Sequence, residues 1–514
     1  MPELLQIPEL RRLATRGGAA LMNGRSDAQD EIRGLVEGAP DRAGVEIANV
    51  RRVDGLAVVL GKIASIDRNP TLLMVVATSP SAASAGGDEL GTVIAAWGDP
   101  SELLAAEGPP RALTTDSTRR PGVIADVDPA ATVAEWLGLP YDAGAPMERT
   151  GEPAPLDLYE RYLQQRRLAV PVAAGAWGLM LLFGLAGFLA LAFRERVSPG
   201  TLAVAGALAG SLPWLALGLL LVGHLPSLTV ATVVPFLMVT MIAGVAFDRW
   251  VEARRGIFVA LTARGGVILG VLAIEAALGW PAAVTPLAGG GQLDGGRFFG
   301  MPNVEIGIVL GSAMFAAHRL RVGTGVLLLI ACAVVTGSPW TGSNFGAAIT
   351  LFAAAGMWLA IRRRRPWWMI VLVTGAITAI GTAAVALMHR YLTDRPTHVT
   401  AFLEETHGIV GAIERQLERL GVGLDLITDN PLALVPVVGT LVLLVVVLRP
   451  PAAIAQSFEG HDAWRDAVLV ILLGSIVAYL SEDTGAAAIG FAFGFALSGL
   501  IDVSLDSARR MIAR

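Results

Sequence analysis

The sequence contains little cysteine and little charge for its length. One cysteine, Cys332, in 514 residues excludes an intrachain disulfide and a metal site built from several thiolates. Only 16% of the residues are charged and 54% are hydrophobic, whereas about 25% of the residues of a soluble domain are charged. The net charge of −5 offers no general basic surface for nucleic acid. These values exclude a purely soluble enzyme and a disordered chain.

Two common catalytic motifs are also missing from the sequence. The single lysine, Lys62, stands in Gly-Lys-Ile without the glycine spacing of a nucleotide-binding loop. The Gly-x-Ser-x-Gly motif of many hydrolases does not occur. The sequence therefore indicates no cofactor.

Charge and hydropathy divide the chain near residue 167. The head, residues 1–167, has 17 basic and 24 acidic residues, a net charge of −7, whereas residues 168–514 have 22 and 20, a net charge of +2. From residue 168 onward, apolar runs recur that approach or exceed the roughly 20 residues needed to cross a bilayer. We predict a mainly α-helical chain with about eleven membrane spans, of which the fifth and tenth are short. The predicted spans are 168–193, 201–223, 227–247, 257–280, 304–317, 324–340, 344–361, 367–388, 431–448, 466–481 and 485–502.

The arginines between these spans predict their orientation. When alternate loops are assigned to one side, sixteen arginines gather there and five on the other side. Loops rich in Arg and Lys stay in the cytoplasm. We therefore expect a multi-pass membrane protein with a cytoplasmic C-terminus and, because the number of spans is odd, an extracytoplasmic head.

Export of the head needs a signal that residues 1–20 do not contain, because they have no apolar segment. We expect that the natural chain begins upstream, in a signal or anchor helix. The alternative is a cytoplasmic head and one miscounted span.

The head has the pattern of an α/β domain. Two apolar runs, Thr71–Ala77 and Gly91–Trp97, predict β-strands. A helix is predicted over 129–138, with Asp126 or Asp128 as its N-cap. Alternating strands and helices favour a mostly parallel sheet.

Residues 113–140 (LTTDSTRRPGVIADVDPAATVAEWLGLP) carry a resemblance to a known family. They resemble the late part of the alkaline-phosphatase-like superfamily domain, where a Ser/Thr-rich turn, Arg-Pro-Gly and an Asp-x-x-Pro-Thr helix start lead to a Leu-Gly pair. With its membrane part, the whole chain resembles a group of uncharacterised actinobacterial polytopic membrane proteins with such an extracytoplasmic head. The resemblance implies an anchor helix, then a phosphatase-like domain, then a many-helix membrane domain.

The head differs from this superfamily at the positions of the metal ligands and the nucleophile. The superfamily uses two metal ions, held by Asp and His beside a Ser or Thr nucleophile. The head has no histidine, the family Thr after Pro is Ala130, and the early strand with the first metal-binding Asp is missing. We therefore expect a partial, catalytically inactive head without a metal. An anion site is one interpretation of its polar turn and a solvated turn is the other; the candidates are Ser117, Thr118, Arg119 and Arg120.

Three glycine-rich polar segments are predicted on the outer side of the membrane domain. They are 294–305, 336–346 and 481–485, and they resemble segments of the same actinobacterial group. Irregular backbone at membrane depth is tolerated where it lines protein or a wet cavity. We expect either an outward polar pocket or ligand-free surface loops. The pocket candidates are Arg297, Asn303, Glu305, Asn344, Glu482 and Asp483.

Two ionisable residues lie within the fourth predicted span. Glu275 is an intramembrane carboxylate, a type of residue that often has a function. We expect Arg297 as its partner, in a structural ion pair or in a functional site. Arg264 lies nearer the inner side, and we expect its side chain to extend to the cytoplasmic surface.

The long loop 389–430 has apolar residues at helical spacing. This pattern predicts one or two amphipathic helices on the outer membrane surface or under the head. His398 and His407 lie in this loop, nine residues apart, and we expect both to be solvated.

Three functions are compatible with this organisation. The first is a cell-envelope protein whose inactive head lies above an outward pocket for a lipid-linked or phosphate-bearing substrate. The second is a transporter or flippase in which Glu275, Glu482 and Asp483 couple to protons or cations; such proteins often contain internal repeats, and none is evident. The third is a metal-dependent phosphotransferase or hydrolase, which requires an upstream region that restores the metal ligands.

Overall fold

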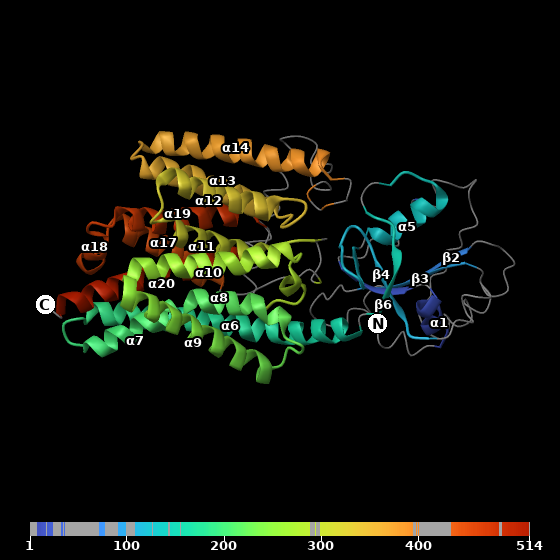
Figure 1. Cartoon of the computed structure of the whole chain (residues 1–514), viewed down its shortest axis with the longest axis horizontal. Coiled ribbons are helices and arrows are strands. Elements are labelled where there is room, and N and C mark those ends of the chain that lie inside the picture. Colours follow the sequence, from blue (N-terminus) through green and yellow to red (C-terminus); the bar gives the residue numbers. More distant parts are fainter. Residues whose placement is uncertain are drawn as a thin grey trace. The chain divides into compact units, whose positions relative to one another are not determined.

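The computed structural model describes most of the chain from residue 108 onward and shorter parts before it (Figure 1). The described residues are 8–16, 18–23, 32–33, 35, 71–77, 91–98, 108–125, 127–141, 144–154, 156–287, 293, 299–393, 397, 399, 433–482 and 486–512. They fall into two compact units. The sheet unit takes its residues from 1–163, 291–299 and 393–401, and the helical unit holds the rest.

The sheet unit contains six described strands, in the order β2-β3-β1-β4-β6 with β5 also paired to β1. Three of the five strand pairings are antiparallel, namely β1–β3, β2–β3 and β4–β6. The predicted strands are confirmed, but the expected mostly parallel sheet is wrong, because β2 and β3 follow each other in the chain and pair antiparallel. The strands are β1 (Gly18–Asn23), β2 (Thr71–Ala77), β3 (Gly91–Gly98), β4 (Arg111–Thr114), β5 (Val123–Ala125) and β6 (Glu148–Pro153).

Two described helices accompany the sheet, α1 (Pro8–Arg16) and α5 (Asp128–Leu137). The predicted helix is confirmed as α5, and Gly138 ends it in the left-handed conformation at φ +64°. Asp128 is not the N-cap. It is the first helical residue, Val127 holds the cap position, and no side chain caps the helix. Asp126 lies outside the described residues.

The remaining helices follow in sequence and are mostly apolar. They are α6 (Leu156–Ala192), α7 (Pro199–Gly210), α8 (Leu212–Leu221), η3 (Val222–His224), α9 (Val230–Arg255), α10 (Ile257–Ala277), η4 (Pro281–Val284), η6 (Asn303–Glu305), α11 (Ile306–Ala317), α12 (Val322–Gly337), α13 (Phe345–Arg362), α14 (Trp367–Tyr391), α17 (Leu434–Leu448), α18 (Ala452–Phe458), α19 (Asp462–Ser481) and α20 (Ala486–Ile512).

Eight described helical segments are long and apolar enough to cross a membrane, or nine if the bent pair α17 and α18 is one span. The chain is therefore a multi-pass membrane protein that is mainly helical, with a small sheet near its N-terminus. Each predicted span overlaps a helix. The short ones are the fifth and sixth, α11 and α12, with 12 and 16 residues, whereas the tenth is α19 with 20. The number of eleven spans stays a prediction.

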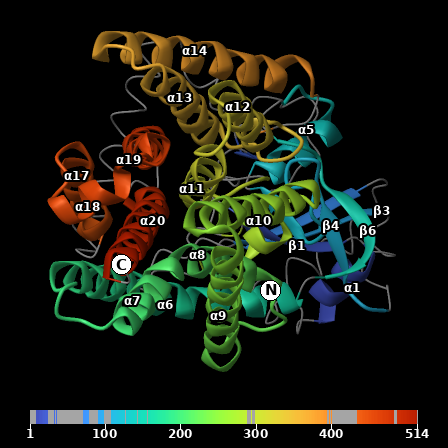
Figure 2. The same ribbon diagram turned by 60° about the vertical axis from the view of Figure 1, so that its left-hand side comes forward.

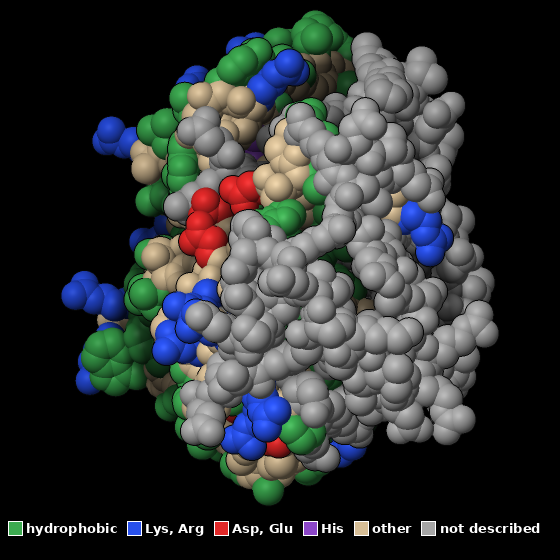
Figure 3. All heavy atoms as spheres, turned by 90° about the vertical axis from the view of Figure 1, so that its right-hand side faces the viewer, with side chains coloured by type: hydrophobic (Ala, Val, Ile, Leu, Met, Phe, Trp, Pro, Cys, Tyr) green, Lys and Arg blue, Asp and Glu red, His purple; other side chains and the backbone are tan. Residues whose placement is uncertain are grey.

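The helical unit is built around α20. The apolar window of α20 is buried along its whole length, whereas the windows of α9 and α14 are mostly exposed. In both ribbon views α14 lies at the margin of the helices (Figures 1 and 2). Figure 3 shows hydrophobic side chains, in green, at the edge of the described surface. Exposed apolar side chains on a long helix fit contact with lipid.

Side-chain contacts define two opposite ends of this unit. α13 and α19 are antiparallel neighbours: Arg362, at the end of α13, bonds to Asp466 in the first turns of α19, and Gly346, at the start of α13, meets Ser481 at the end of α19. We call the end of the unit with Arg362 and Asp466 the arginine end, and the end with Gly346 and Ser481 the motif end. The antiparallel pair α13 and α19 agrees with the predicted alternation of loops, and the side of the membrane that each end faces stays a prediction.

Part of the predicted loop 389–430 is described. α14 continues to Tyr391, and His389 is buried with its Nε2 atom 2.8 Å from the carbonyl oxygen of Gly337. The amphipathic helices, His398 and His407 lie outside the described residues.

Candidate functional site

The first and second glycine-rich segments are joined at the motif end by their backbones. The amide of Met301 donates a hydrogen bond of 2.7 Å to the carbonyl oxygen of Gly342. Gly300 has φ +104°, and a Cβ atom there would lie 1.9 Å from the same carbonyl oxygen. Glycine is therefore required at this position by conformation and by contact.

Asn303 and Asn344 are brought together by this junction. Asn344 is buried and caps α13, because its Oδ1 atom accepts a hydrogen bond of 2.8 Å from the amide of Ala347. Its Nδ2 atom donates to the carbonyl oxygen of Met301 at 3.2 Å and to Oδ1 of Asn303 at 3.3 Å. The side chain thus links the two segments.

The third segment joins the second at Gly346. A Cβ atom on Gly346 would lie 2.6 Å from Cδ of Glu482, so glycine lets this buried carboxyl group pack against the start of α13. The Ser481 hydroxyl is 3.3 Å from the carbonyl oxygen of Gly346 and 3.1 Å from the hydroxyl of Thr350. Glu305 is fully buried at the end of η6. We call Asn303, Glu305, Asn344 and Glu482 the motif cluster.

Among the described residues, Glu275 contacts His224 and Ala282. Its Oε1 atom is 2.5 Å from Nε2 of His224, and its Oε2 atom accepts a hydrogen bond of 3.1 Å from the amide of Ala282. Trp280 connects this corner to the second segment, since its Nε1 atom donates to the carbonyl oxygen of Thr341 at 2.6 Å. The expected partner Arg297 lies outside the described residues, as does Asp483.

Arg264 does not extend to the surface as expected. Its side chain is fully buried, and its Nη2 atom is 2.8 Å from Oδ2 of Asp248 and 3.1 Å from Oδ2 of Asp502. Arg249 also binds Asp502, at 2.9 Å, and Trp214 donates to Asp248 at 2.8 Å. Two carboxylates in reach compensate the buried guanidinium, which makes extension to water unnecessary.

This group, which we call the ionic cluster, was missed from the sequence. Asp248 falls just outside the third predicted span, and Asp502 is the last residue of the eleventh. The sequence analysis gave neither residue a role. One signal was available: an arginine inside a predicted span requires a carboxylate from another span unless it reaches water.

In the sheet unit, Asp128 organises the polar turn that was proposed to bind anions. Its carboxylate accepts hydrogen bonds from the hydroxyls of Thr115 at 2.8 Å and Ser117 at 2.6 Å, and from the amides of Ala125 at 2.7 Å and Ala145 at 3.0 Å. All of these groups are buried. Burial raises the pKa of Asp128 to about 6, although the hydrogen bonds act in the opposite direction.

The four predicted anion-binding residues differ in their surroundings. Ser117 binds Asp128, and the Thr118 hydroxyl donates to the carbonyl oxygen of Val123 at 2.6 Å, so both hydroxyls are buried and used within the turn. Arg119 has φ +56°, and its guanidinium carbon lies 4.4 Å from the ring centre of Phe299. Arg120 is partly buried. Anion binding by the two arginines stays a prediction.

No three His, Cys, Asp or Glu side chains within the described ranges are arranged to hold a metal ion. Comparisons with family models, curated proteins and solved structures find no match for this chain. The class that the fold defines is a multi-pass membrane protein with a small mixed sheet in its N-terminal part. The resemblance to actinobacterial proteins with an alkaline-phosphatase-like head stays a prediction.

Proposed function

We propose that the chain is a protein of the bacterial plasma membrane whose motif cluster binds a lipid-linked or phosphate-bearing substrate on the outer side. The observation behind this proposal is the junction of three segments distant in sequence: Asn303 and Asn344 link the first two, and Glu482 packs against Gly346 of the second. Glu305 and Glu482 are both buried. The orientation rests on the arginine-rich loops.

The chemistry of the cluster fits a polar ligand. Carboxylates and amide oxygens accept hydrogen bonds from hydroxyl groups, and amide nitrogens donate them. Burying ionisable groups in a membrane protein costs free energy, so such groups commonly mark a functional site. Arg297, which the sequence assigns to the same site, supplies a cation for a phosphate in this proposal.

Lipid analysis of the purified protein tests the proposal. We expect native mass spectrometry of the detergent-purified full chain to detect a bound envelope lipid, and Glu482→Gln to reduce its occupancy about tenfold. The matched control is Glu459→Gln near the arginine end, which should retain the lipid. Equal lipid occupancy in both variants, with thermal unfolding unchanged, contradicts the proposal.

The ionic cluster favours a second candidate, a proton- or cation-coupled transporter. Asp248, Arg264 and Asp502 come from three different helices and are buried together. Such networks in membrane interiors often couple ion movement to transport. Uptake of a substrate into proteoliposomes that depends on a pH gradient, and is lost in Asp502→Asn, supports this function. Gradient-independent uptake excludes it.

A further inference from the structure

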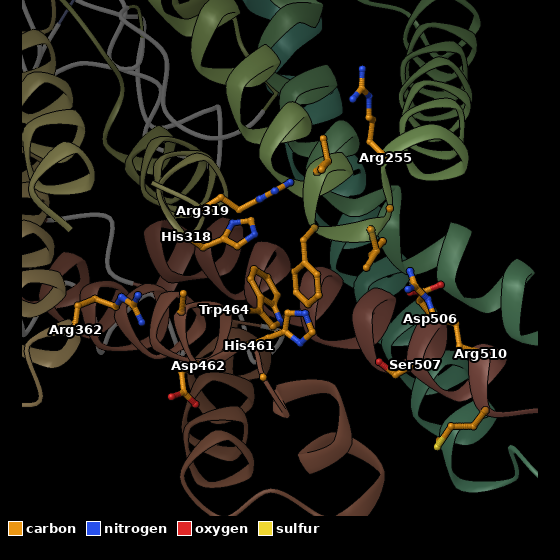
Figure 4. Close-up of a pocket in the computed structure, with 17 residues that line it drawn as sticks. Arg255, His318, Arg319, Arg362, His461, Asp462, Trp464, Asp506, Ser507 and Arg510 are labelled. Atoms are coloured by element: carbon orange, nitrogen blue, oxygen red, sulfur yellow. The ribbon is translucent and has the colours of Figure 1, made fainter. Parts of the chain in front are cut away.

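A cavity of about 770 Å³ opens at the arginine end of the helical unit (Figure 4). Its walls come from the start of α10, the residues after α11, the end of α13, the start of α19 and the end of α20. Figure 4 shows His318 and Arg319 on one side and Asp506 and Arg510 on the other. The lining contains four arginines, which are Arg255, Arg319, Arg362 and Arg510.

Two of these arginines have no ion-pair partner among the described residues. Arg510 pairs with Asp506 at 2.8 Å and Arg362 with Asp466 at 3.2 Å. Arg255 and Arg319 form no ion pair or side-chain hydrogen bond with the described residues. The other lining carboxylate, Asp462, binds Arg364 at 3.0 Å. The described charges around the cavity therefore favour an anion.

The backbone adds to this positive potential. α10 and α19, with 21 and 20 residues, both begin at the cavity, and neither has a side chain capping its N-terminus. The free amides of a helix N-terminus attract anions, and phosphate groups above all.

His318, which lines the cavity, has a ring nitrogen without a hydrogen-bond partner among the described residues. The residue is only 4% exposed, and its Nδ1 atom is 2.7 Å from the carbonyl oxygen of Phe315, which fixes a proton on Nδ1. The Nε2 atom is then an acceptor, and it is buried with no hydrogen-bond partner among the described residues. Burial lowers the pKa of His318 to about 4, so the ring is neutral at physiological pH.

We propose that this cavity binds a phosphorylated polyol, with the phosphate held by Arg255, Arg319 and the two helix N-termini and a neighbouring hydroxyl donating to Nε2 of His318. A phosphatidylglycerol headgroup and soluble glycerol phosphate share this chemistry. The floor of the cavity offers apolar contact to the carbon skeleton, because Phe258 stacks on His461 at 4.1 Å and lies 6.4 Å from Trp464. The site is separate from the motif cluster, so it does not depend on the proposed function.

Calorimetric titration of the full chain in phosphatidylcholine nanodiscs tests the soluble form of the ligand. We expect glycerol 3-phosphate to bind about tenfold more tightly than inorganic phosphate, because it adds the hydrogen bond to His318. Arg255→Gln and Arg319→Gln should each weaken glycerol phosphate binding about tenfold. The matched control is Arg321→Gln, an exposed arginine two residues from Arg319 that does not line the cavity. Glu482→Gln at the motif end should also leave binding unchanged.

A pair of substitutions separates the role of His318 from its packing. His318→Gln retains an acceptor and should keep the preference for glycerol phosphate, whereas His318→Leu should abolish the preference and leave phosphate binding intact.

Native mass spectrometry of nanodiscs that contain phosphatidylglycerol tests the lipid source. If the protein retains phosphatidylglycerol and Arg319→Gln reduces this retention, the natural ligand of the cavity is the lipid headgroup. Displacement of glycerol phosphate by phosphatidylglycerol gives the same assignment. Binding of both probes that is independent of Arg255 and Arg319 overturns the proposal, and so does a failure of both probes to bind.

Discussion

Arg264 and Asp502 form an ion pair inside the helical unit, with 3.1 Å between Nη2 and Oδ2, although 238 residues separate them along the chain. A second carboxylate, that of Asp248, also contacts this arginine, with 2.8 Å between its Oδ2 atom and the same Nη2 atom. The contact fastens α20 to α9 and α10. It also explains how a guanidinium group remains deep within a predicted span.

Removal of this guanidinium should destabilise the protein strongly. We expect Arg264→Met to lower the free energy of unfolding by about 3 kcal/mol or more, because Asp248 and Asp502 then remain buried without their shared cation. Arg254→Met is the control, since Arg254 is exposed and lies over the ring of Trp250, and it should cost less than about 1 kcal/mol. Unfolding in detergent mixtures measures both. A similar loss in the two variants contradicts the assigned role.

The cap of α13 gives a second prediction. Asn344→Ala should lower the stability by about 1–2 kcal/mol, because the amide of Ala347 loses its acceptor and the first two segments lose their side-chain link. Asn344→Ser keeps an acceptor at the cap and should lose less. The midpoint of thermal unfolding separates the two variants, and an identical midpoint would show that the cap contributes nothing.

A third prediction concerns the junction at Gly300. Gly300→Ala should disrupt the motif cluster, since φ +104° is strained for alanine and its Cβ atom would meet the carbonyl oxygen of Gly342. Gly266→Ala is the matched control in α10, where a Cβ atom meets nothing within 4 Å. We expect reduced yield and thermal stability only in the first variant. Equal behaviour would mean that the two segments do not meet as described.

The sheet unit should lose stability as pH rises from about 4 to about 6. The pKa of Asp128 is about 6 in the folded chain and 3.8 without burial, so the folded state binds more protons in this window. This difference corresponds to about 3 kcal/mol, which is present in full below pH 4 and lost above pH 6. Hydrogen exchange of the amides in β4 and β5, corrected for intrinsic rates, measures the effect. Asp128→Asn should flatten the profile, and an unchanged profile in that variant would assign the effect to another group.

The orientation can be measured because the chain has one cysteine. In a Cys332→Ser background, Glu195→Cys lies in an arginine-rich loop and Pro226→Cys lies beside His224 at the motif end. We expect an impermeant maleimide to label Pro226→Cys in intact cells and to label Glu195→Cys only after lysis. The reverse pattern would place the motif cluster in the cytoplasm.

Local patterns in the sequence predicted most of the elements. Apolar runs predicted spans that overlap every α-helix from α6 to α14, although α7 and α8 were expected as one span, and two apolar runs in the head predicted β2 and β3. These signals depend on neighbouring residues. The meeting of the described parts of the three glycine-rich segments, 299–305, 336–346 and 481–482, at one end also agrees with loop alternation, which needs no detailed packing.

Long-range contacts were beyond the same reasoning. The residues next to Asp248 and Asp502 in the sequence do not indicate that Arg264 is their partner. The carboxylate of Glu275 likewise contacts His224, which lies in a different helix. The sheet was predicted as mostly parallel because strands and helices were expected to alternate. The order of elements along the chain does not specify the direction in which strands pair, so this prediction was wrong. Side-chain partners across a membrane unit are set by helix packing, which one sequence leaves open.

Glycines on α11 restrict how the helical unit can move. Gly307 and Gly311 meet Ala488 and Phe495 of α20 so closely that added Cβ atoms would lie 2.6 Å and 2.3 Å from them. On its other side, the carbonyl oxygen of Ser312 lies 2.4 Å from the position of a Cβ on Gly265 in α10. α11 is therefore tightly packed between α10 and α20, and we expect these three helices to move together. We therefore expect a rearrangement that opens a path for a ligand to move the peripheral helices, such as α9 and α14, rather than α10, α11 and α20 against one another.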